Sequence, residues 1–469
     1  MPKIETLARG LFKTSKIVKK YLKKAENENI ITSLSGFCYF PIWSETPGHA
    51  KIKFWLNGWS FSFRFLFILL KNILAIASNA KYFICNNYDA SKKYNTLILS
   101  WAFKENFQTD GSFIDRYFNE NSKNLLDSHW VLISMDGHVP LNLNKNITLI
   151  KKKKSFFKYN FFYLAKIFVL LVIESRFSLK KILHYFSFHS YFAKQMSLIV
   201  KKILKKNNYK TILMSYEAQP FHQFIISEAK SIDKKIRTIG YFHSMLPAIP
   251  CDFVYRSGAP DLLLVHGESQ AEVFQSKLNW PKNKMLLIES LRFRLDENRS
   301  LSKKIYLPYI IDSKSILIKE FKKLLINSSK NNFPKLEVKI HQANLNSKKH
   351  LYLKRELEET MNLYKKSFSD TPSNKNISIF FGVTATIFEA LENGINVIHI
   401  CSDPVFESHS EEIWPNLKVK QLNEFTFHYS IIVPRKYINF GKNNIFFPMP
   451  IYINISENLN GRIRRIYLD

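Results

Sequence analysis

The sequence of 469 residues predicts an α/β protein in which two Rossmann-like, doubly wound domains face a cleft, with extra helices in the N-terminal half. Three observations lead to this fold class. Short apolar segments of strand character alternate with segments of helical period. The alternation restarts after a junction near residues 289–303. Polar residues follow several strands directly, and ligands of doubly wound sheets bind at that end of the strands.

The N-terminal half repeats this pattern from residue 95 to residue 290, which we predict as one domain. A helical insertion is expected over residues 155–206, where the apolar residues follow a helical period. We also expect a helix to begin near Pro220, and the run from Asp115 to Phe118 to lie in a helix. The expected strands are 96–101, 130–134, 147–150, 210–215, 236–242, 262–265 and 285–288.

The C-terminal half, residues 291–469, is predicted as the second domain. Its central motif runs from a strand into Gly382, then into a helix with Thr384 at the N-cap, and ends at Gly394 in the C′ position. The N–H groups of a helix N-terminus beside the hydroxyls of Thr384 and Thr386 favour phosphate binding. Glu389 is expected one turn deeper, where its carboxylate accepts hydrogen bonds from ribose hydroxyls. The other expected strands are 304–308, 336–341 and 396–400, and the other helices are 313–324 and 348–366.

The composition of the chain indicates which kinds of partner it attracts. The formal charge of +31 attracts anions such as phosphorylated substrates or acidic lipid headgroups. Residues 1–94 are predicted as a basic helical region, which either lies on a membrane surface or forms soluble helices with a solvated lysine face. The apolar runs near residues 65–76 and 167–173 contain or adjoin charges and fall short of about 18 apolar residues, so we expect buried or membrane-surface helices there and no membrane span. Four widely separated cysteines fit neither a zinc cluster nor a disulfide framework, which indicates a reducing compartment.

Several short motifs resemble a family. They are 115–118 (DRYF), 241–244 (YFHS), 260–267 (PDLLLVHG), 291–293 (LRF), 339–341 (KIH) and 381–386 (FGVTAT). Together, over roughly residues 95–415, they resemble bacterial glycosyltransferases of the GT-B architecture that act in surface carbohydrate (O-antigen, capsule) biosynthesis, similar to sialyl- and Kdo-transferases.

The resemblance implies a donor site. In similar enzymes a Lys-x-His-Pro segment and a Ser/Thr pair hold a cytidine nucleotide, which assigns Lys339, His341, Gly382, Thr384 and Thr386 to donor binding, with Glu389 on the ribose. Gln342 stands where the family has proline, a departure that bears on the donor more than on the fold. A CMP-sugar is the favoured donor, and it is a substrate, so no cofactor is expected. No Asp-x-Asp segment is present to hold Mg²⁺, and we expect a metal-independent enzyme.

Transfer also needs a carboxylate at the acceptor, as general base or as a positioned group in a retaining mechanism. Glu217 is the first candidate, because it directly follows a strand and precedes the helix that begins near Pro220. Asp110 and then Asp136 are further candidates, although acids beside glycine are usually exposed turn residues. His243, at the end of a strand, and Arg292, between the two halves, are the candidate substrate-binding residues.

Two other function classes remain open. A non-catalytic protein that binds RNA through lysines and aromatic residues would suit the composition, although no nucleic-acid module is recognisable. A nucleotide-sugar epimerase of the same architecture would release a modified sugar without any acceptor. We expect a nucleotide-sugar donor, a glycan or glycolipid acceptor, an anionic membrane surface and no nucleic acid as partners. The expected location is the cytoplasm, peripheral on the inner face of the cytoplasmic membrane.

Overall fold

The fold is described from a computed structural model of the chain. The described part comprises residues 93–153, 188–243, 258–293, 300–308, 314–328, 333–341, 344–369, 376–382, 386–401, 416–434 and 436–441, with the short pieces 70, 73–74, 81–86, 165, 169, 253, 255, 311 and 384. Three predicted features lie wholly or mostly outside these residues. They are the part of the basic region 1–94 that precedes residue 70, the helical insertion 155–206, and the two apolar runs near residues 65–76 and 167–173.

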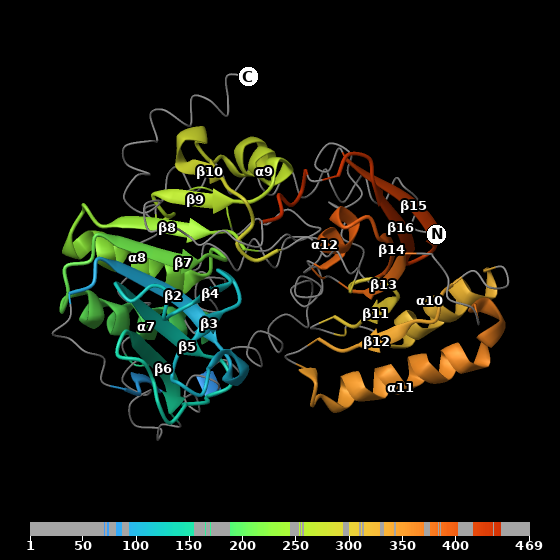
Figure 1. Ribbon diagram of the computed structural model, residues 1–469, viewed down its shortest axis with the longest axis horizontal. Helices are drawn as coiled ribbons and strands as arrows, with labels where there is room; N and C mark the ends of the chain where they lie inside the picture. The colour runs from blue at the N-terminus through green and yellow to red at the C-terminus, as the bar shows by residue number, and fades with distance from the viewer. Residues whose placement is uncertain are drawn as a thin grey trace.

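The first half forms an eight-stranded sheet in the order β1-β6-β5-β2-β7-β8-β9-β10 (Figure 1). All neighbouring strands are parallel except β1, which is antiparallel to β6. The seven expected strands are present, and β1 joins the sheet from ahead of residue 95. The bounds are β1 (Lys81–Ile84), β2 (Thr96–Ala102), β5 (Ser128–Ser134), β6 (Ile147–Lys153), β7 (Thr211–Ser215), β8 (Arg237–Tyr241), β9 (Leu262–Val265) and β10 (Met285–Leu287).

Both faces of this sheet are buried, which explains why its strands are apolar at nearly every position. Leu97 and Leu99 of β2 pack into one core cluster with residues of α7 (Phe188–Leu204), α8 (Pro220–Ile232) and α9 (Glu268–Leu278). Ile98, between them in β2, points to the opposite face and packs with Phe113 and Phe118 in a second cluster. The segment that covers this second face follows β2.

That segment contradicts one expectation. The run from Asp115 to Phe118 is not helical, because β3 (Ile114–Asp115) pairs antiparallel with β4 (Glu120–Asn121) and the residues between them form the turn. The reason is local: the Asp115 carboxylate accepts hydrogen bonds from the backbone N–H groups of Tyr117 and Phe118, both at 2.7 Å. A side chain that satisfies these donors favours a turn over a helix.

The second half forms a six-stranded sheet in the order β12-β11-β13-β14-β16-β15, whose first four strands are parallel. The hairpin of β15 and β16 was not predicted. The bounds are β11 (Lys304–Tyr306), β12 (Glu337–Lys339), β13 (Ile377–Phe381), β14 (Asn396–Ile400), β15 (Leu417–Asn423) and β16 (Thr426–Ile431), with helices α10 (Lys314–Ile326), α11 (Lys348–Leu363) and α12 (Thr386–Glu392), and short 3₁₀ turns η2 (Lys104–Asn106), η4 (Lys282–Lys284) and η6 (Lys365–Ser367). Two doubly wound α/β domains, as predicted, therefore make up the described chain.

After β16 the chain returns to the first domain. We call residues 436–441 the strap (Figure 1). Its backbone bonds to the first domain from Asn439 N–H to the His266 carbonyl at 2.6 Å and from Ser290 N–H to the Asn439 carbonyl at 2.7 Å. On its other side, the buried Glu392 carboxylate of α12 accepts the N–H groups of Tyr437, at 2.6 Å, and Ile438, at 3.3 Å. The strap, expected within the second domain, thus connects both.

Among the described residues, none of the helices combines the length and apolar character that a membrane span requires. Within the same residues, Cys85 and Cys401 are not joined in a disulfide, and no group of three or more potential metal-ligating side chains is found. Cys38 and Cys251 lie outside the described part.

Candidate active site

Each sheet has one topological switch point, where successive connections leave in opposite directions. In the first sheet it lies between β2 and β7, because the chain runs from β2 outward through β5 to β6 and then resumes at β7 on the other side of β2. Glu217 follows the carboxyl end of β7 by two residues, and His243 follows that of the adjacent β8 by two. Ligands of doubly wound sheets bind at this position.

Glu217 and His243 form a pair there. The Nε2 atom of His243 lies 3.2 Å from Oε1 of Glu217, although the alignment falls outside that of a regular hydrogen bond. The Gln219 side chain donates to Oε2 of Glu217 at 2.5 Å. The Glu217 side chain is 35% exposed, whereas that of His243 is 3% exposed. The Glu217 side chain is therefore open to a ligand, whereas His243 is covered.

The backbone at this position is strained. Ala218, directly after Glu217, has a φ of 52°, in the left-handed region that residues with a Cβ rarely adopt. Strain of this kind is retained where the surrounding structure fixes it, and it concentrates at functional sites. Here it turns the chain sharply between β7 and α8, so that Glu217 stands at the sheet edge.

The charge state of the pair follows from its surroundings. Burial alone would raise the pKa of Glu217, but the hydrogen-bonding and charge contributions of His243, then His222 and Gln219, outweigh it and lower the pKa below its ordinary value. Burial lowers the pKa of His243. At neutral pH the pair is thus a Glu217 carboxylate beside a neutral imidazole, the state that a general base requires.

Arg292 completes this cluster. Its Nη1 lies 3.3 Å from Nδ1 of His243 and donates to the His243 carbonyl at 3.4 Å. Because a guanidinium only donates, Nδ1 of His243 is the acceptor and the proton is on Nε2, facing Glu217. The buried Tyr241 hydroxyl accepts the backbone N–H groups of Leu291, at 3.0 Å, and Arg292, at 3.3 Å, which fixes the loop that carries Arg292.

The second switch point lies between β11 and β13, and Gly382 follows β13 there. Gly382 has a φ of 64°, which glycine adopts without cost. The buried His399 ring fixes this turn, since its Nε2 lies 2.7 Å from the Gly382 carbonyl and its Nδ1 lies 2.9 Å from the Tyr429 hydroxyl. Burial lowers the pKa of His399 to about 4, so the ring is neutral and donates through Nε2.

The threonines follow this turn as predicted, with one difference. Thr384 was expected to be the N-cap residue. Helix α12 begins at Thr386, so Thr384 lies one position ahead of the N-cap. The Thr384 hydroxyl lies 3.3 Å from that of Thr386 and accepts its N–H at 3.4 Å. Both hydroxyls and the Glu389 side chain are half-buried. Gly394 has a φ of 70° and ends the helix in a Schellman motif, as predicted.

Lys339 is the last residue of the edge strand β12, and His341 lies two residues further along the chain. Both residues are exposed. Lys339 pairs with Glu337 of the same strand at 2.6 Å, an exposed contact that costs little to exchange for a ligand. Partial burial of the ring, then the charges of His350 and Arg292, lower the pKa of His341. The contacts of the Arg292 guanidinium at hydrogen-bond distance are with His243 of the first domain.

The other acidic candidates have structural partners. Asp110 forms an exposed ion pair with Lys123 and accepts the Ser112 N–H at 2.8 Å, and these contacts lower its pKa. The Asp136 carboxylate accepts the N–H groups of Lys104, at 2.8 Å, and His138, at 2.9 Å. Both arrangements are those of turn acids. Glu217 is the candidate whose surroundings are those of a site.

One residue of the cluster was not among the predicted site residues. The Tyr117 ring lies against the His243 ring, with their centroids 4.2 Å apart, and the Arg292 guanidinium carbon lies 5.8 Å from the Tyr117 centroid. Tyr117 belongs to the turn between β3 and β4, about a hundred positions before Glu217. Its motif was noted in the sequence, but nothing in the spacing ties it to the end of β7.

The chain was compared with protein-family models, curated proteins and solved structures. A scan against protein-family models and a comparison with curated proteins find no match. Among solved structures, an α,α-trehalose 6-phosphate synthase from Burkholderia multivorans is similar over 64% of this chain and 80% of its own, at 8% identity and a TM-score of 0.34. The wall teichoic acid polymerase TagF is similar over 73% and 79%, at 11% and 0.30. A UDP-GlcNAc 2-epimerase from Neisseria meningitidis is similar over 68% and 85%, at 10% and 0.33. These scores are low, and the fold assignment rests on the strand order.

Proposed function

We propose that the protein is a glycosyltransferase of the GT-B architecture that moves a sugar from a nucleotide-sugar, with a CMP-sugar favoured, to a surface-polysaccharide or lipid-linked acceptor. One observation carries the proposal. Each doubly wound sheet has polar residues at its switch point, Glu217 in the first and Thr384 and Thr386 in the second, and Arg292 lies beside His243 at the end of the first domain. A two-substrate enzyme needs this pair of sites at one place.

In this proposal Glu217 serves the acceptor. Its carboxylate takes the proton from the acceptor hydroxyl as that oxygen attacks the anomeric carbon of the donor. The bond between the anomeric carbon and the phosphate oxygen breaks, and its electron pair leaves on the phosphate. His243 holds the carboxylate ionised and oriented, which is why its low exposure fits a positioning role better than direct substrate contact.

The second domain serves the donor. The turn at Gly382 and the hydroxyls of Thr384 and Thr386 would hold the phosphate, with Glu389 on the ribose. Lys339, His341 and Arg292 supply positive charge and hydrogen-bond donors that stabilise the leaving phosphate, the role that a divalent cation has in other transferases. Metal independence is therefore part of the proposal.

We further propose that the enzyme acts at the inner face of the cytoplasmic membrane. The formal charge of +31 supports this, since a strongly basic protein is attracted to anionic leaflets. Sedimentation with anionic vesicles but not with neutral ones, reversed by salt, is the expected result. If equal amounts of protein sediment with anionic and neutral vesicles, the proposed attachment to the membrane is wrong.

Titration calorimetry with CMP, CDP, UDP and GDP tests the donor class. One nucleotide should bind about tenfold more tightly than the others, a difference of about 1.4 kcal/mol. The double variant Thr384→Ala with Thr386→Ala should lose this binding, whereas Cys85→Ser, outside both switch points, should retain it. Unchanged affinity in the double variant would remove the donor assignment. Sugar conversion without any acceptor would instead identify an epimerase.

A further inference from the structure

The turn between β3 and β4 brings an aromatic side chain to the Glu217 cluster. The Tyr117 ring covers the nearly buried His243 ring at 4.2 Å between centroids. Burial raises the pKa of the Tyr117 hydroxyl, the Glu217 charge raises it further, and the Arg292 charge opposes this. Tyr117 therefore remains a neutral phenol at physiological pH, within electrostatic reach of both charged side chains.

A buried carboxylate fixes this turn. Asp115 is fully buried, and its Oδ1 accepts the N–H groups of Tyr117 and Phe118, both at 2.7 Å. Its Oδ2 has no hydrogen-bond partner of regular geometry in the described part of the chain, although the nearby Ser100 hydroxyl lowers the pKa of Asp115 and so partly offsets the effect of burial, which raises it. Asn119 then closes the turn with a φ of 50°. A partly unsatisfied buried carboxyl and a left-handed residue both cost stability, which is retained where a specific geometry is needed.

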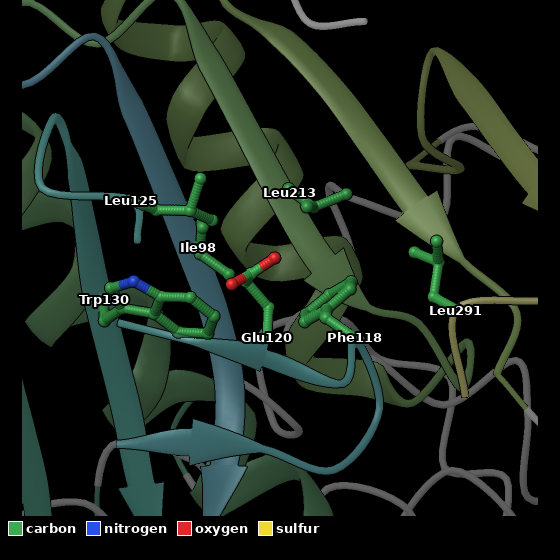
Figure 2. A pocket seen from close by; sticks show the side chains of 7 residues that line it. All are labelled: Ile98, Phe118, Glu120, Leu125, Trp130, Leu213 and Leu291. Carbon is green, nitrogen blue, oxygen red and sulfur yellow. The ribbon is translucent and has the colours of Figure 1, made fainter. Parts of the chain in front are cut away.

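Packing and hydrogen bonds together hold the turn. Phe118 packs against the Trp130 and Tyr241 rings, with centroids 6.5 and 5.8 Å apart. A small apolar pocket lies between the β3–β4 hairpin and the sheet, lined by Phe118 and by Leu291, the neighbour of Arg292 (Figure 2). The remaining lining residues are Ile98, Glu120, Leu125, Trp130 and Leu213. The hydrogen bonds to Asp115 add to this packing the orientation of the Tyr117 backbone.

We infer that Tyr117 contacts the glycan acceptor beside Glu217 and that Asp115 is the positioning residue that places it there. The inference deepens the proposed transferase function and rests on it. The phenol hydroxyl hydrogen-bonds an acceptor hydroxyl next to the one that Glu217 deprotonates. It takes no part in breaking the donor bond. Tyr117 therefore distinguishes a glycan acceptor from water, which reacts at the same anomeric carbon without needing this contact.

This distinction defines the test, which compares sugar transfer with donor hydrolysis in the same enzyme. The donor is the one selected by calorimetry, and the acceptor is the glycan that receives most sugar on an array. Tyr117→Phe keeps the ring and removes the hydroxyl. We expect about a tenfold loss of kcat/KM for the glycan, corresponding to about 1.4 kcal/mol, with hydrolysis of the donor unchanged.

Asp115 is tested by two variants. Asp115→Asn retains an oxygen that accepts the two N–H groups and should transfer to the glycan within about threefold of the unaltered enzyme. Asp115→Ala removes that oxygen and should show the same selective loss as Tyr117→Phe. Glu105→Gln is the matched control, because it breaks only the exposed ion pair with Arg116 in the same hairpin and should leave both rates unchanged.

The outcomes are separable. If Tyr117→Phe lowers transfer and hydrolysis by the same factor, or lowers neither of them, the proposed contact between Tyr117 and the acceptor is wrong. If Asp115→Ala lowers the thermal stability but leaves the ratio of transfer to hydrolysis unaltered, Asp115 is only structural and the positioning role is wrong. If the unaltered enzyme neither transfers nor hydrolyses any nucleotide-sugar, the proposed function itself fails.

Discussion

Replacing Gly267 with alanine probes the contact between the strap and the first domain. Gly267 has a φ of −147°, an extended conformation that any residue adopts, so alanine brings no backbone strain. An added Cβ, however, would lie 2.0 Å from the Tyr437 carbonyl oxygen and 2.6 Å from its carbon. The cost of the substitution is therefore entirely steric, and the opposing atoms are backbone.

The magnitude follows from what must move. A relaxed carbon–oxygen contact is about 3.3 Å, so the strap has to withdraw by roughly 1 Å. That shift breaks the bonds from Ser269 N–H to the Lys436 carbonyl, from Asn439 N–H to the His266 carbonyl, and from Ser290 N–H to the Asn439 carbonyl. At about 1 kcal/mol for each hydrogen bond, the free energy of unfolding falls by about 3 kcal/mol.

Scanning calorimetry and urea denaturation measure this loss. With about 2–4 °C for each kcal/mol in a domain of this size, Tm should fall by about 6–12 °C. Gly394→Ala is the matched control, because Gly394 has a φ of 70° and no atom within 4 Å of an added Cβ. It should cost only about 1–2 kcal/mol of backbone strain. A Gly267→Ala protein as stable as the Gly394→Ala protein would refute the packing described for the strap.

Three further outcomes are expected. His243→Ala removes the interactions that lower the pKa of Glu217, so that pKa rises and the acid limb of the pH–rate profile should move to higher pH; an unmoved limb would separate His243 from Glu217. His399→Ala removes the hydrogen bonds that its ring makes with the Gly382 carbonyl and the Tyr429 hydroxyl, and should lower stability by about 2–4 kcal/mol and weaken nucleotide binding, as read by denaturation and calorimetry. Transfer should persist in excess EDTA, and its loss with recovery on adding Mg²⁺ would contradict metal independence.

The strands and the glycine turn were predictable because their signals are local. The central strands of the first sheet, such as β2, β5 and β7, are apolar runs buried on both faces, and Gly382 and Gly394 have the positive φ that their places in the motif require. The position of Glu217 at the carboxyl end of β7 was predictable for a related reason, since its place directly after a strand is visible in the sequence. Parallel topology then carries such residues to one edge of the sheet.

The features that were not predictable from the sequence depend on tertiary contacts. The turn at Asp115 looks helical in a short window, because its hydrogen bonds to Tyr117 and Phe118 are a property of the buried carboxylate. The burial of His243 follows from a tyrosine that is far away in the chain. The strap has no periodic pattern, and its place is set by backbone bonds to loops of the first domain.

The strap also determines how the domains can move. Within the residues that the structure describes, the chain leaves the first domain after Phe293 and comes back at Lys436, so two separate crossings join the domains there. Two connections at separate places resist a twist of one domain against the other more than a single connection does. We therefore expect the domains to open and close about the line between the two connections.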